Sequence, residues 1–475
     1  MTTATHGGTT AITRRLAEWV AALREETIPP AVIRHVKLGL LDTLGCGLFG
    51  STLPWGQTVI TFTRTLGRGE EATIWGDGTR VPAANAALAN GTLVHAFEMD
   101  DLHASGVLHP GAVSVTAALA VGERRERAGG PPISGRGLLL ALVAGYEVGA
   151  RVGLACGYAA LKRGFHPAAT TGVFCAAAAS SRILGLDADA TQDALGTAGT
   201  QASGLMAAQY GSMVKRMHMG RSAQSGIYAA DLAAMGFRGV REVLDAPYGG
   251  FLSTLVGDAA DPAVITDGLG ERYELLGTGF KIYPSCGSSH TTVDALLAIK
   301  ARCPELSPDL VASVVVWTTT STRDHVGWPY VPDTVTSAQM NLPYTVGALL
   351  VDGGLTVESF AEHRLRDPRI LALADRVRVD VDPAFDALGR EGRHTVRVQV
   401  RLTDGRLFEE TRSKARGTAD VPLTEDDLAG KFLDLAGRVV GRPRAERILD
   451  MVRHCEEIPA VVPLVSELIG KGEQR

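Results

Sequence analysis

Residues 394–411, HTVRVQVRLTDGRLFEET, alternate apolar and polar side chains on both sides of an Asp-Gly pair. Such alternation is typical of strands with one buried face, and Asp-Gly favours a two-residue hairpin turn. Two runs upstream, residues 310–321 and 377–381, are rich in β-branched residues, which also favour strands. Together these stretches predict a small sheet built around a hairpin.

The sequence on either side of this sheet favours helices. Residues 32–49 place apolar side chains at helical spacing directly after a Pro-Pro pair, and later runs are rich in Ala. Beyond the hairpin, Thr424 is a candidate N-cap for a further helix. We therefore predict a mainly α protein: a large all-helical domain built from both chain ends, residues 1–271 and 416–475, with an inserted smaller α+β domain, residues 272–415.

Composition and charge argue against several functional classes. The 475 residues are 45% hydrophobic, ample for a core, and the net charge of −5 argues against a nucleic-acid partner. The most apolar run, residues 137–145, is much shorter than the ~18 residues that span a bilayer, and the N-terminus has no secretory signal. The six cysteines are scattered singly, without zinc or iron–sulfur spacing. A cytoplasmic protein with no membrane partner is expected.

Residues 95–109, HAFEMDDLHASGVLH, concentrate acids and bases in an otherwise Ala- and Leu-rich region. On a helix, His95, Glu98 and Leu102 would share one face, with Asp101 near it. His109 precedes a proline, which pushes its backbone out of the helical region and favours a loop position. Because the ordinary pKa of His lies nearest neutrality, this stretch is the first candidate for proton transfer.

Two basic stretches follow. Residues 162–166, KRGFH, precede a proline and a Thr-rich helix start, so His166 and backbone N–H groups could face an anion; a basic surface loop is the alternative. Residues 211–221, GSMVKRMHMGR, contain no acid, and Arg can grip a carboxylate with two hydrogen bonds. A site for a small polyanion is predicted. Its candidate substrate-binding groups are Lys215, Arg216, His218 and Arg221.

Two stretches in the α+β region add further candidates. Residues 278–290, TGFKIYPSCGSSH, place Lys281 where the chain enters this region. Cys286 is a nucleophile by type, but a packing role is favoured because no cationic activator stands nearby in the sequence. Residues 337–344, SAQMNLPY, end in Tyr344, which could donate a proton or simply pack.

Five ordered blocks, HAFEMDD…HPGA, GFHPAATTG, VKRMHMGRSAQSG, FKIYPSCGSSH and NLPY, resemble the MmgE/PrpD family over roughly residues 30–460. The resemblance implies an all-helical domain with an α+β lid, a homodimer, and an active site in the cleft between the domains. Family members include 2-methylcitrate dehydratase, cis-aconitate decarboxylase and iminodisuccinate epimerase. All three act on small polycarboxylates without a metal or organic cofactor.

Carried over block by block, the resemblance implies catalytic roles for six residues and leaves Asp101 as a further candidate for substrate binding. Two positions depart from the decarboxylase pattern, which has Asp in place of Glu98 and Thr in place of Leu102. The dehydratases resemble Asn-Asp-Thr-Trp in the first block, which is also missing here. The six implied catalytic residues are His109, His166, Lys215, Lys281, Tyr344 and Glu98.

We therefore expect a cofactor-independent lyase or isomerase that acts on a di- or tricarboxylate by proton abstraction next to a carboxylate. A 2-methylcitrate dehydratase-like hydro-lyase is favoured, with an epimerase of a substituted succinate as the alternative. A cis-aconitate-type decarboxylase or a non-catalytic binding protein is less favoured. A metal-dependent hydrolase using His95, Glu98, Asp101 and His103 is a further rival, although their spacing matches no established metal motif.

Overall fold

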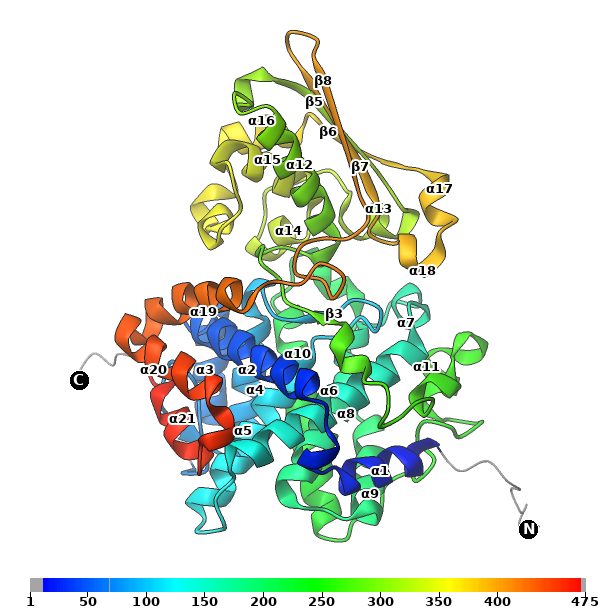
Figure 1. Cartoon of the computed structure of the whole chain (residues 1–475), viewed down its shortest axis with the longest axis vertical. Helices are drawn as coiled ribbons and strands as arrows, with labels where there is room; N and C mark the ends of the chain where they lie inside the picture. Colours follow the sequence, from blue (N-terminus) through cyan, green and yellow to red (C-terminus); the bar gives the residue numbers. More distant parts are fainter. Residues whose placement is uncertain (1–11, 68, 471–475) are drawn as a thin grey trace.

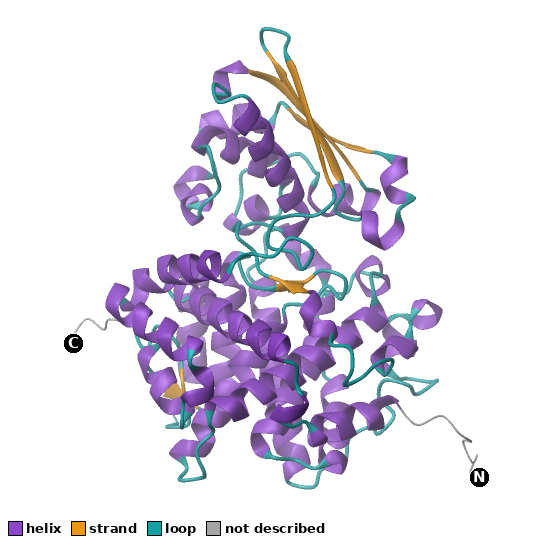
Figure 2. Ribbon diagram, in the orientation of Figure 1, coloured by secondary structure: helices purple, strands orange, loops and turns teal. Residues whose placement is uncertain are grey.

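The computed structural model describes residues 12–67 and 69–470. Figure 1 shows two units stacked along the long axis, with both chain ends in the lower one. We call the lower unit, which contains α1–α11 and α19–α21, the helical body, and the upper one, which contains α12–α18 and β5–β8, the α+β unit. Figure 2 shows that the long strands all lie in the α+β unit. The predicted mainly α fold is confirmed.

The centre of the helical body is built from long helices rich in Ala and Gly. Helix α8 packs against both α6 and α10, and α10 packs against α4. A Cβ on Gly91 would lie 2.7 Å from the Cα of Gly220, so the backbones of α4 and α10 touch where they cross. This close approach brings the end of α4 beside the first turn of α10. The central helices are α2 (Pro30–Gly50), α4 (Ala83–Val94), α5 (Pro110–Arg127), α6 (Gly135–Cys156), α8 (Pro167–Leu184) and α10 (Val214–Ala234).

Shorter elements complete the helical body on its outside. One of the central helices, α6, is long and apolar enough to cross a membrane, but 89% of its most apolar window is buried, so it is a core helix of this body. The short strands β1 and β2 pair with each other. The peripheral elements are α1 (Ile12–Ala22), α3 (Pro54–Thr65), β1 (Ala72–Thr73), β2 (Arg80–Val81), α7 (Ala159–Lys162), α9 (Ala188–Gly199) and α11 (Phe251–Leu255).

The C-terminal segment returns to the helical body, as Figure 1 shows for the orange and red helices. Helix α19 (Glu425–Val440) packs against α2 near the N-terminus. The predicted N-cap is confirmed: the Thr424 side chain accepts a hydrogen bond from the backbone N–H of Asp427, which caps in return. Helices α20 (Arg442–Arg453) and α21 (Val461–Glu467) follow.

The α+β unit is built on a four-stranded sheet in the order β6-β5-β7-β8. The predicted hairpin is confirmed, because β7 and β8 pair antiparallel with Arg401 opposite Leu407. The strand predicted over residues 310–321 ends earlier, at Thr318, because the Thr319 side chain caps a helix, α13. The strands are β5 (Val311–Thr318), β6 (Val377–Val381), β7 (Val396–Leu402) and β8 (Leu407–Arg412).

Helices cover the sheet and lead back to the helical body. Helix α12 packs on β7 and β8, and α15 packs on β6. The helices of this unit are α12 (His290–Arg302), α13 (Thr320–Val326), α14 (Val335–Gln339), α15 (Leu342–Asp352), α16 (Pro368–Ala374), α17 (Pro383–Asp386) and α18 (Gly389–Gly392).

One buried lysine joins the segments that meet between the two units. Strand β3 (Leu102–His103) pairs with β4 (Thr278–Gly279), which sets the first acidic stretch beside the entry to the α+β unit. From α19, Lys431 Nζ donates to Asp42 Oδ1 at 2.5 Å, to the Met99 carbonyl at 2.5 Å and to the Lys281 carbonyl at 2.8 Å. Lys431 thus ties α2, the acidic stretch, the entry to the α+β unit and the C-terminal return together.

Candidate active site

The acidic stretch carries unusual backbone geometry. The 3-10 helix η2 (His95–Phe97) ends at Glu98, whose φ of 57° and ψ of 27° are left-handed. Val107, with φ of 51°, is the other described non-glycine residue with a positive φ. Such conformations cost on the order of 1–3 kcal/mol and persist where the surrounding structure imposes them, typically at functional sites. Both outliers therefore mark the stretch between η2 and α5 as a candidate functional site.

The Glu98 carboxylate is surrounded by three cations. It accepts hydrogen bonds from Lys215 Nζ and Arg216 Nη1, both in the first turn of α10, and from Lys281 Nζ at 3.2 Å. All four side chains are buried. Burial alone would raise the pKa of Glu98, but these three cations outweigh it and hold the pKa well below its usual range. Glu98 is therefore an ionised anchor that fixes both lysines.

Asp100 lies between two imidazoles. Its Oδ2 is 2.9 Å from His95 Nδ1 and 3.2 Å from His109 Nδ1. His109 Nδ1 is also 2.6 Å from the Asp101 carbonyl, which can only accept, so the proton of His109 resides on Nδ1 and Nε2 is left for a ligand. Burial alone would raise the pKa of Asp100, but His109 and His95 outweigh it and hold the pKa well below its usual range.

The two lysines differ in their hold on a proton. Burial lowers the pKa of Lys215 despite Glu98, and its Nζ lies 3.2 Å from His95 Nε2. For Lys281, burial alone would lower the pKa, but Glu98 and Asp100 together raise it above its usual value. Lys281 thus remains a fixed positive charge, whereas Lys215 releases its proton more easily. Neighbouring titratable groups whose pKa values are pushed apart are typical of acid–base sites.

A second pair of histidines adjoins the first. His166 Nδ1 and His218 Nδ1 are 2.8 Å apart, so one donates its proton to the other. Burial is the main cause that lowers both pKa values, that of His218 to about 4 and that of His166 well below its usual range. Two neutral imidazoles result, and His218 fixes the ring of His166.

Five of these groups, Glu98, His109, His166, Lys215 and Lys281, line one narrow cavity of about 60 Å³ between the helical body and the α+β unit. Its lining combines polar and apolar side chains. A larger hollow of about 460 Å³ adjoins it and shares Leu102, Ala104, Lys281, Gly287 and His394 with its lining. The polar lining residues are Glu98, His109, His166, Lys215, Lys281, Cys286, Ser288, His325, Arg393 and His394, and the large apolar ones are Leu102, Val107, Leu161, Met206 and Met340.

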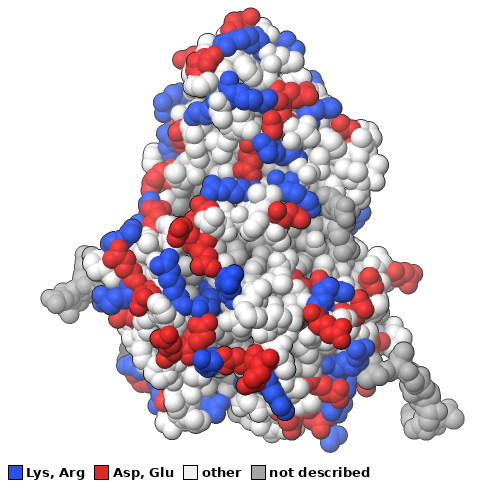
Figure 3. Space-filling model, viewed as in Figure 1, with Lys and Arg blue, Asp and Glu red and all other residues white. Residues whose placement is uncertain are grey.

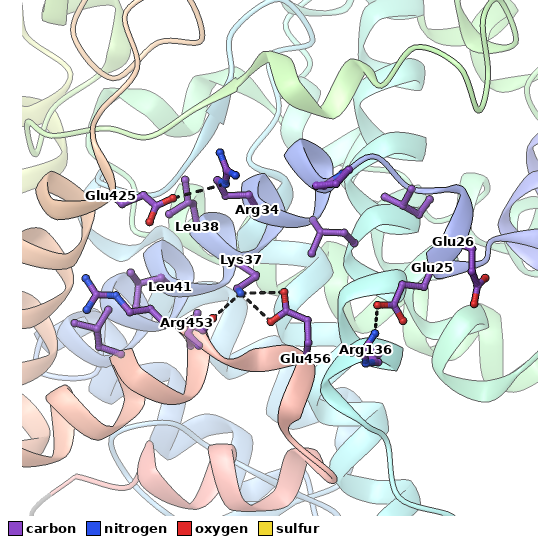
Figure 4. Close-up of a pocket in the computed structure, with 15 residues that line it drawn as sticks. Glu25, Glu26, Arg34, Lys37, Leu38, Leu41, Arg136, Glu425, Arg453 and Glu456 are labelled. Carbon is purple, nitrogen blue, oxygen red and sulfur yellow. Dashed lines mark hydrogen bonds and ion pairs between the residues drawn. The ribbon is translucent and has the colours of Figure 1, made fainter.

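A more spacious cleft of about 810 Å³ lies elsewhere, between α2 and the C-terminal helices (Figure 4). Its charges already pair among themselves: Lys37 Nζ lies 2.8 Å from Glu456, and Arg136 pairs with Glu25. These two cations are therefore already paired with carboxylates and are not available to bind a polyanion. Figure 3 likewise shows acidic and basic side chains interspersed over the viewed face.

Two family models match most of the chain, and the second extends beyond the α+β unit into α19 and α20 of the helical body. The family model for the MmgE/PrpD N-terminal domain matches residues 14–262, and that for the MmgE/PrpD C-terminal domain matches residues 283–457. The chain belongs to the MmgE/PrpD family. The stretch between the two matched ranges contains β4 and Lys281.

Relatives within this family are similar over nearly their whole length. The chain is 33% identical to a cis-aconitate decarboxylase-like protein, oryM, of Aspergillus oryzae, over 97% of this chain and 98% of the relative. It is 31% identical to a cis-aconitate decarboxylase of Aspergillus terreus, over 96% of both chains. It is 28% identical to the cis-aconitate decarboxylase of Homo sapiens, over 97% of this chain and 95% of the relative.

Five of the six catalytic residues implied by the family resemblance meet at the cavity, and Tyr344 does not. Its hydroxyl donates to the Ser359 carbonyl at 2.8 Å, and its ring packs between Tyr330 and Phe360. The same stretch lines the cavity through Met340, and the neighbouring Gln339 Nε2 donates to the Phe97 and Pro284 carbonyls at 2.9 Å. Tyr344 is thus corrected to a packing residue.

Three of the predicted substrate-binding residues also have other roles. Arg216 lies behind Glu98, where its Nη2 donates to Gln339 Oε1 at 2.8 Å. Arg221 pairs with Gln224 outside the cavity lining. The buried Asp101 carboxyl accepts from Tyr146 at 2.7 Å and from the Gly111 N–H at 3.1 Å, and burial raises its pKa well above the usual value. Asp101 therefore pins the start of α5 behind His109.

The sequence did not reveal the partner of Cys286. Its Sγ lies 3.8 Å from Nδ1 of His325, which is 39 positions away in α13. Burial alone would raise the pKa of the Cys286 thiol, but His325 outweighs it and lowers the pKa to about 7. Cys286 is buried among core residues, as the sequence favoured, and its thiol also lines the cavity beside His325.

The four residues proposed for a metal-dependent hydrolase do not converge. His103 Nε2 lies 2.9 Å from the Glu274 carbonyl, and Glu98 is enclosed by cations. A different trio, His95, Asp100 and His109, comes within 4.8 Å of one another. Its members are already bonded to each other, with Asp100 serving both imidazoles, an arrangement suited to orienting a proton donor.

Proposed function

We propose that this protein is a lyase that removes carbon dioxide from a small unsaturated tricarboxylate of the cis-aconitate type. The observation that carries this proposal is the mixed lining of the cavity, which brings cations and imidazoles together with aliphatic side chains. The names of the full-length relatives agree with it. The proposal replaces the dehydratase that the sequence motifs favoured, which becomes the second candidate.

The charge around the cavity suits a polyanion. Four basic side chains, Lys215, Arg216, Lys281 and Arg393, are buried at or directly behind the cavity, with the two ionised carboxylates of Glu98 and Asp100 near them. Burying positive charge without compensation is costly. A ligand with two or three carboxylates would restore the balance, which explains why the site is built for such a substrate.

The reaction needs one proton and no redox step. A proton is added to one carbon of the double bond, the double bond moves to the neighbouring carbon pair, and the bond to the departing carboxylate breaks. An unsaturated tricarboxylate plus one proton thus gives an unsaturated dicarboxylate and carbon dioxide. His109 is the proposed proton donor: because Asp100 and the Asp101 carbonyl hold its Nδ1–H, a doubly protonated ring would present Nε2–H to the substrate. Lys281 and Lys215 hold the carboxylates that remain.

The apolar lining residues favour the departure of carbon dioxide. A carboxylate beside Leu102 and Val107 would lose much of its hydration, and its conversion to neutral carbon dioxide removes that charge. The cations of the lining would hold the other carboxylates by direct ion pairs. The apolar and the charged residues would thus act on different parts of the same substrate.

A hydro-lyase is the second candidate, because Glu98 and Leu102 both depart from the decarboxylase pattern and both line the cavity. With a β-hydroxy tricarboxylate, His109 could remove a proton next to a carboxylate and a second acid could assist the leaving hydroxyl. The same groups would then perform dehydration.

Proton NMR in D₂O distinguishes these reactions. The chelator-treated protein is incubated with cis-aconitate, citrate, 2-methylcitrate and substituted succinates. Loss of carbon dioxide from cis-aconitate with one deuterium in the product supports the proposal. Loss of water from a hydroxy acid would establish the dehydratase, and exchange with an unchanged skeleton would establish an epimerase. No change in any of these acids would overturn the assignment to this substrate class.

A further inference from the structure

Arg393 occupies a fixed position at the lower edge of the α+β unit, between α18 and β7. Its carbonyl accepts hydrogen bonds from Thr319 Oγ1 at 2.9 Å and from Thr322 Oγ1 at 2.7 Å. Both donors flank the start of α13. These two hydrogen bonds therefore fix the backbone of Arg393 against the start of α13.

The Arg393 side chain is buried without a partner. The residue is only 7% exposed, and its Nε has no hydrogen-bond acceptor. No ion pair or hydrogen bond joins its guanidinium to any side chain that the structure describes, which leaves out those of residues 390 and 391. Two other buried arginines differ: Arg151 binds Glu147 and five backbone carbonyls, and Arg216 binds Glu98, although its Nε also has no acceptor. An unpaired buried charge of this kind requires an explanation.

The contacts of the guanidinium place it at the junction of the two units. It stacks on the ring of Tyr158, in the helical body, with 4.0 Å between its central carbon and the ring centroid. It also lines the same cavity as Lys215, Lys281 and His166. Stacking satisfies none of its N–H groups, so their hydrogen-bonding capacity remains available to a ligand in the cavity.

The neighbouring His394 repeats this pattern. It lines the same cavity, and its buried Nδ1 has no hydrogen-bond partner. Burial, together with the positive charge of Arg393, lowers its pKa well below the usual value, so the ring is a neutral donor and acceptor. Two adjacent residues with unmet polar groups at one cavity point to a ligand rather than to a folding role.

We propose that Arg393 and His394 form a carboxylate subsite contributed by the α+β unit, in addition to Lys215 and Lys281, which line the same cavity. A planar carboxylate matches the two parallel N–H groups of a guanidinium, and the imidazole can supply a further donor. The inference rests on the proposed function for the class of ligand, and deepens it: a third carboxylate, beyond those held by Lys215 and Lys281, would be recognised across the junction.

The subsite is tested by binding, without turnover. Isothermal titration of propane-1,2,3-tricarboxylate, an inert saturated tricarboxylate, is compared between the wild type and R393Q. We expect the dissociation constant to rise about 10- to 100-fold, because a charge-assisted fork of hydrogen bonds is lost. H394Q should raise it by about 2- to 10-fold. An unchanged affinity in R393Q would overturn the subsite.

A matched control and a rescue separate binding from folding. Arg397 lies four positions further along the chain, in β7, and also stacks on an aromatic ring, that of Trp317 at 4.7 Å, but it does not line the cavity. R397Q should therefore bind the tricarboxylate as the wild type does. Methylguanidinium added to R393A should restore part of the affinity, since it can refill the vacated space. Loss in R393A without rescue would assign Arg393 a structural role and reject the subsite.

The wild-type titration also separates this inference from the proposed function. If the wild type binds the tricarboxylate and R393Q binds it equally well, only the subsite is wrong. If the wild type binds neither the tricarboxylate nor cis-aconitate, the substrate class and the subsite both fail.

Discussion

The helical side and the α+β side of the cavity differ in how their charged groups are paired. On the helical side, Glu98 binds three cations and Asp100 lies between two imidazoles, so these groups hold each other in place, although Asp100 Oδ1 and Arg216 Nε have no partner of their own. On the α+β side, Arg393 Nε and His394 Nδ1 have no hydrogen-bond partner, and Arg393 forms no ion pair with any side chain that the structure describes. The first side is preorganised for proton chemistry, and the second keeps hydrogen-bonding capacity for a ligand. Changes to the two sides should therefore have different consequences.

The largest effect is expected from removing the proton donor of the helical side. H109Q should lower kcat by about 10²- to 10⁴-fold, because the imidazole that Asp100 orients is lost while the cations that bind carboxylates remain. Turnover of cis-aconitate is measured by NMR, and binding of the inert tricarboxylate by titration. H454Q, at an exposed histidine of α20, is the matched control. Near-normal kcat in H109Q would remove His109 from the chemistry.

The second effect concerns stability. E98Q leaves Lys215, Arg216 and Lys281 buried without their shared carboxylate, which should cost about 3 kcal/mol of the free energy of unfolding. E147Q is the matched control: its partner Arg151 keeps five backbone carbonyl acceptors, so the cost should be smaller. Urea denaturation at pH 7 measures both. Equal losses of the free energy of unfolding in the two variants would show that Glu98 contributes no more to stability than Glu147 does.

The buried carboxylates of the helical side also predict that the free energy of unfolding depends on pH. Glu98 and Asp100 have pKa values held well below their usual ranges, so their contribution to stability is fully present above the unfolded-state pKa values of about 4. That contribution is lost as the pH falls from about 4 towards the folded-state values, because the unfolded chain then binds more protons. Urea midpoints at pH 7 and pH 3.5 measure the loss. E98Q should show a smaller loss than the wild type, and an identical one would refute the linkage.

Sequence reasoning found the helical side more completely than the α+β side, for a physical reason. Glu98, His109 and Lys215 lie in short runs dense in charge, and such runs stand out against the Ala-rich helices. Arg393 is one arginine among several next to the hairpin, and only the fold shows that it is buried and unpaired. Tyr344 was misplaced because a motif fixes the position of a residue in the chain but not the direction of its side chain.

The fold itself was predictable where local chemistry dictated it. The Asp-Gly hairpin and the Thr424 cap depend on residues close in sequence, and both formed as expected. The end of the strand at Thr318 was missed because a Thr-rich run can either continue a strand or cap a helix. Contacts with the rest of the chain determine which of the two forms. The tie made by Lys431 joins segments hundreds of positions apart, beyond the reach of any local pattern.

The smallest predicted effect concerns Cys286, which lies on the α+β side of the cavity. At pH 7, iodoacetamide should alkylate Cys286 about 10-fold faster than any other cysteine, because the thiolate is the nucleophile. His325 lowers the pKa of Cys286 to about 7, whereas burial raises those of Cys156 and Cys175 to about 12. H325Q should slow the reaction about 10-fold, since it removes the group that favours the thiolate. H363Q, at an exposed histidine, is the control.

Mass spectrometry of alkylated peptides gives the rate at each cysteine, and the rate at Cys286 should rise with pH through about 7. Because Cys286 lines the cavity, saturating propane-1,2,3-tricarboxylate should protect it, whereas Cys303, outside the cavity lining, should be unaffected. Protection in the wild type but not in R393Q at the same ligand concentration would tie the thiol and the arginine to one ligand site. If Cys286 reacts no faster than Cys303, or equally fast in H325Q, then His325 does not favour the thiolate. The two sides of the cavity would then differ less than the pairing of their groups indicates.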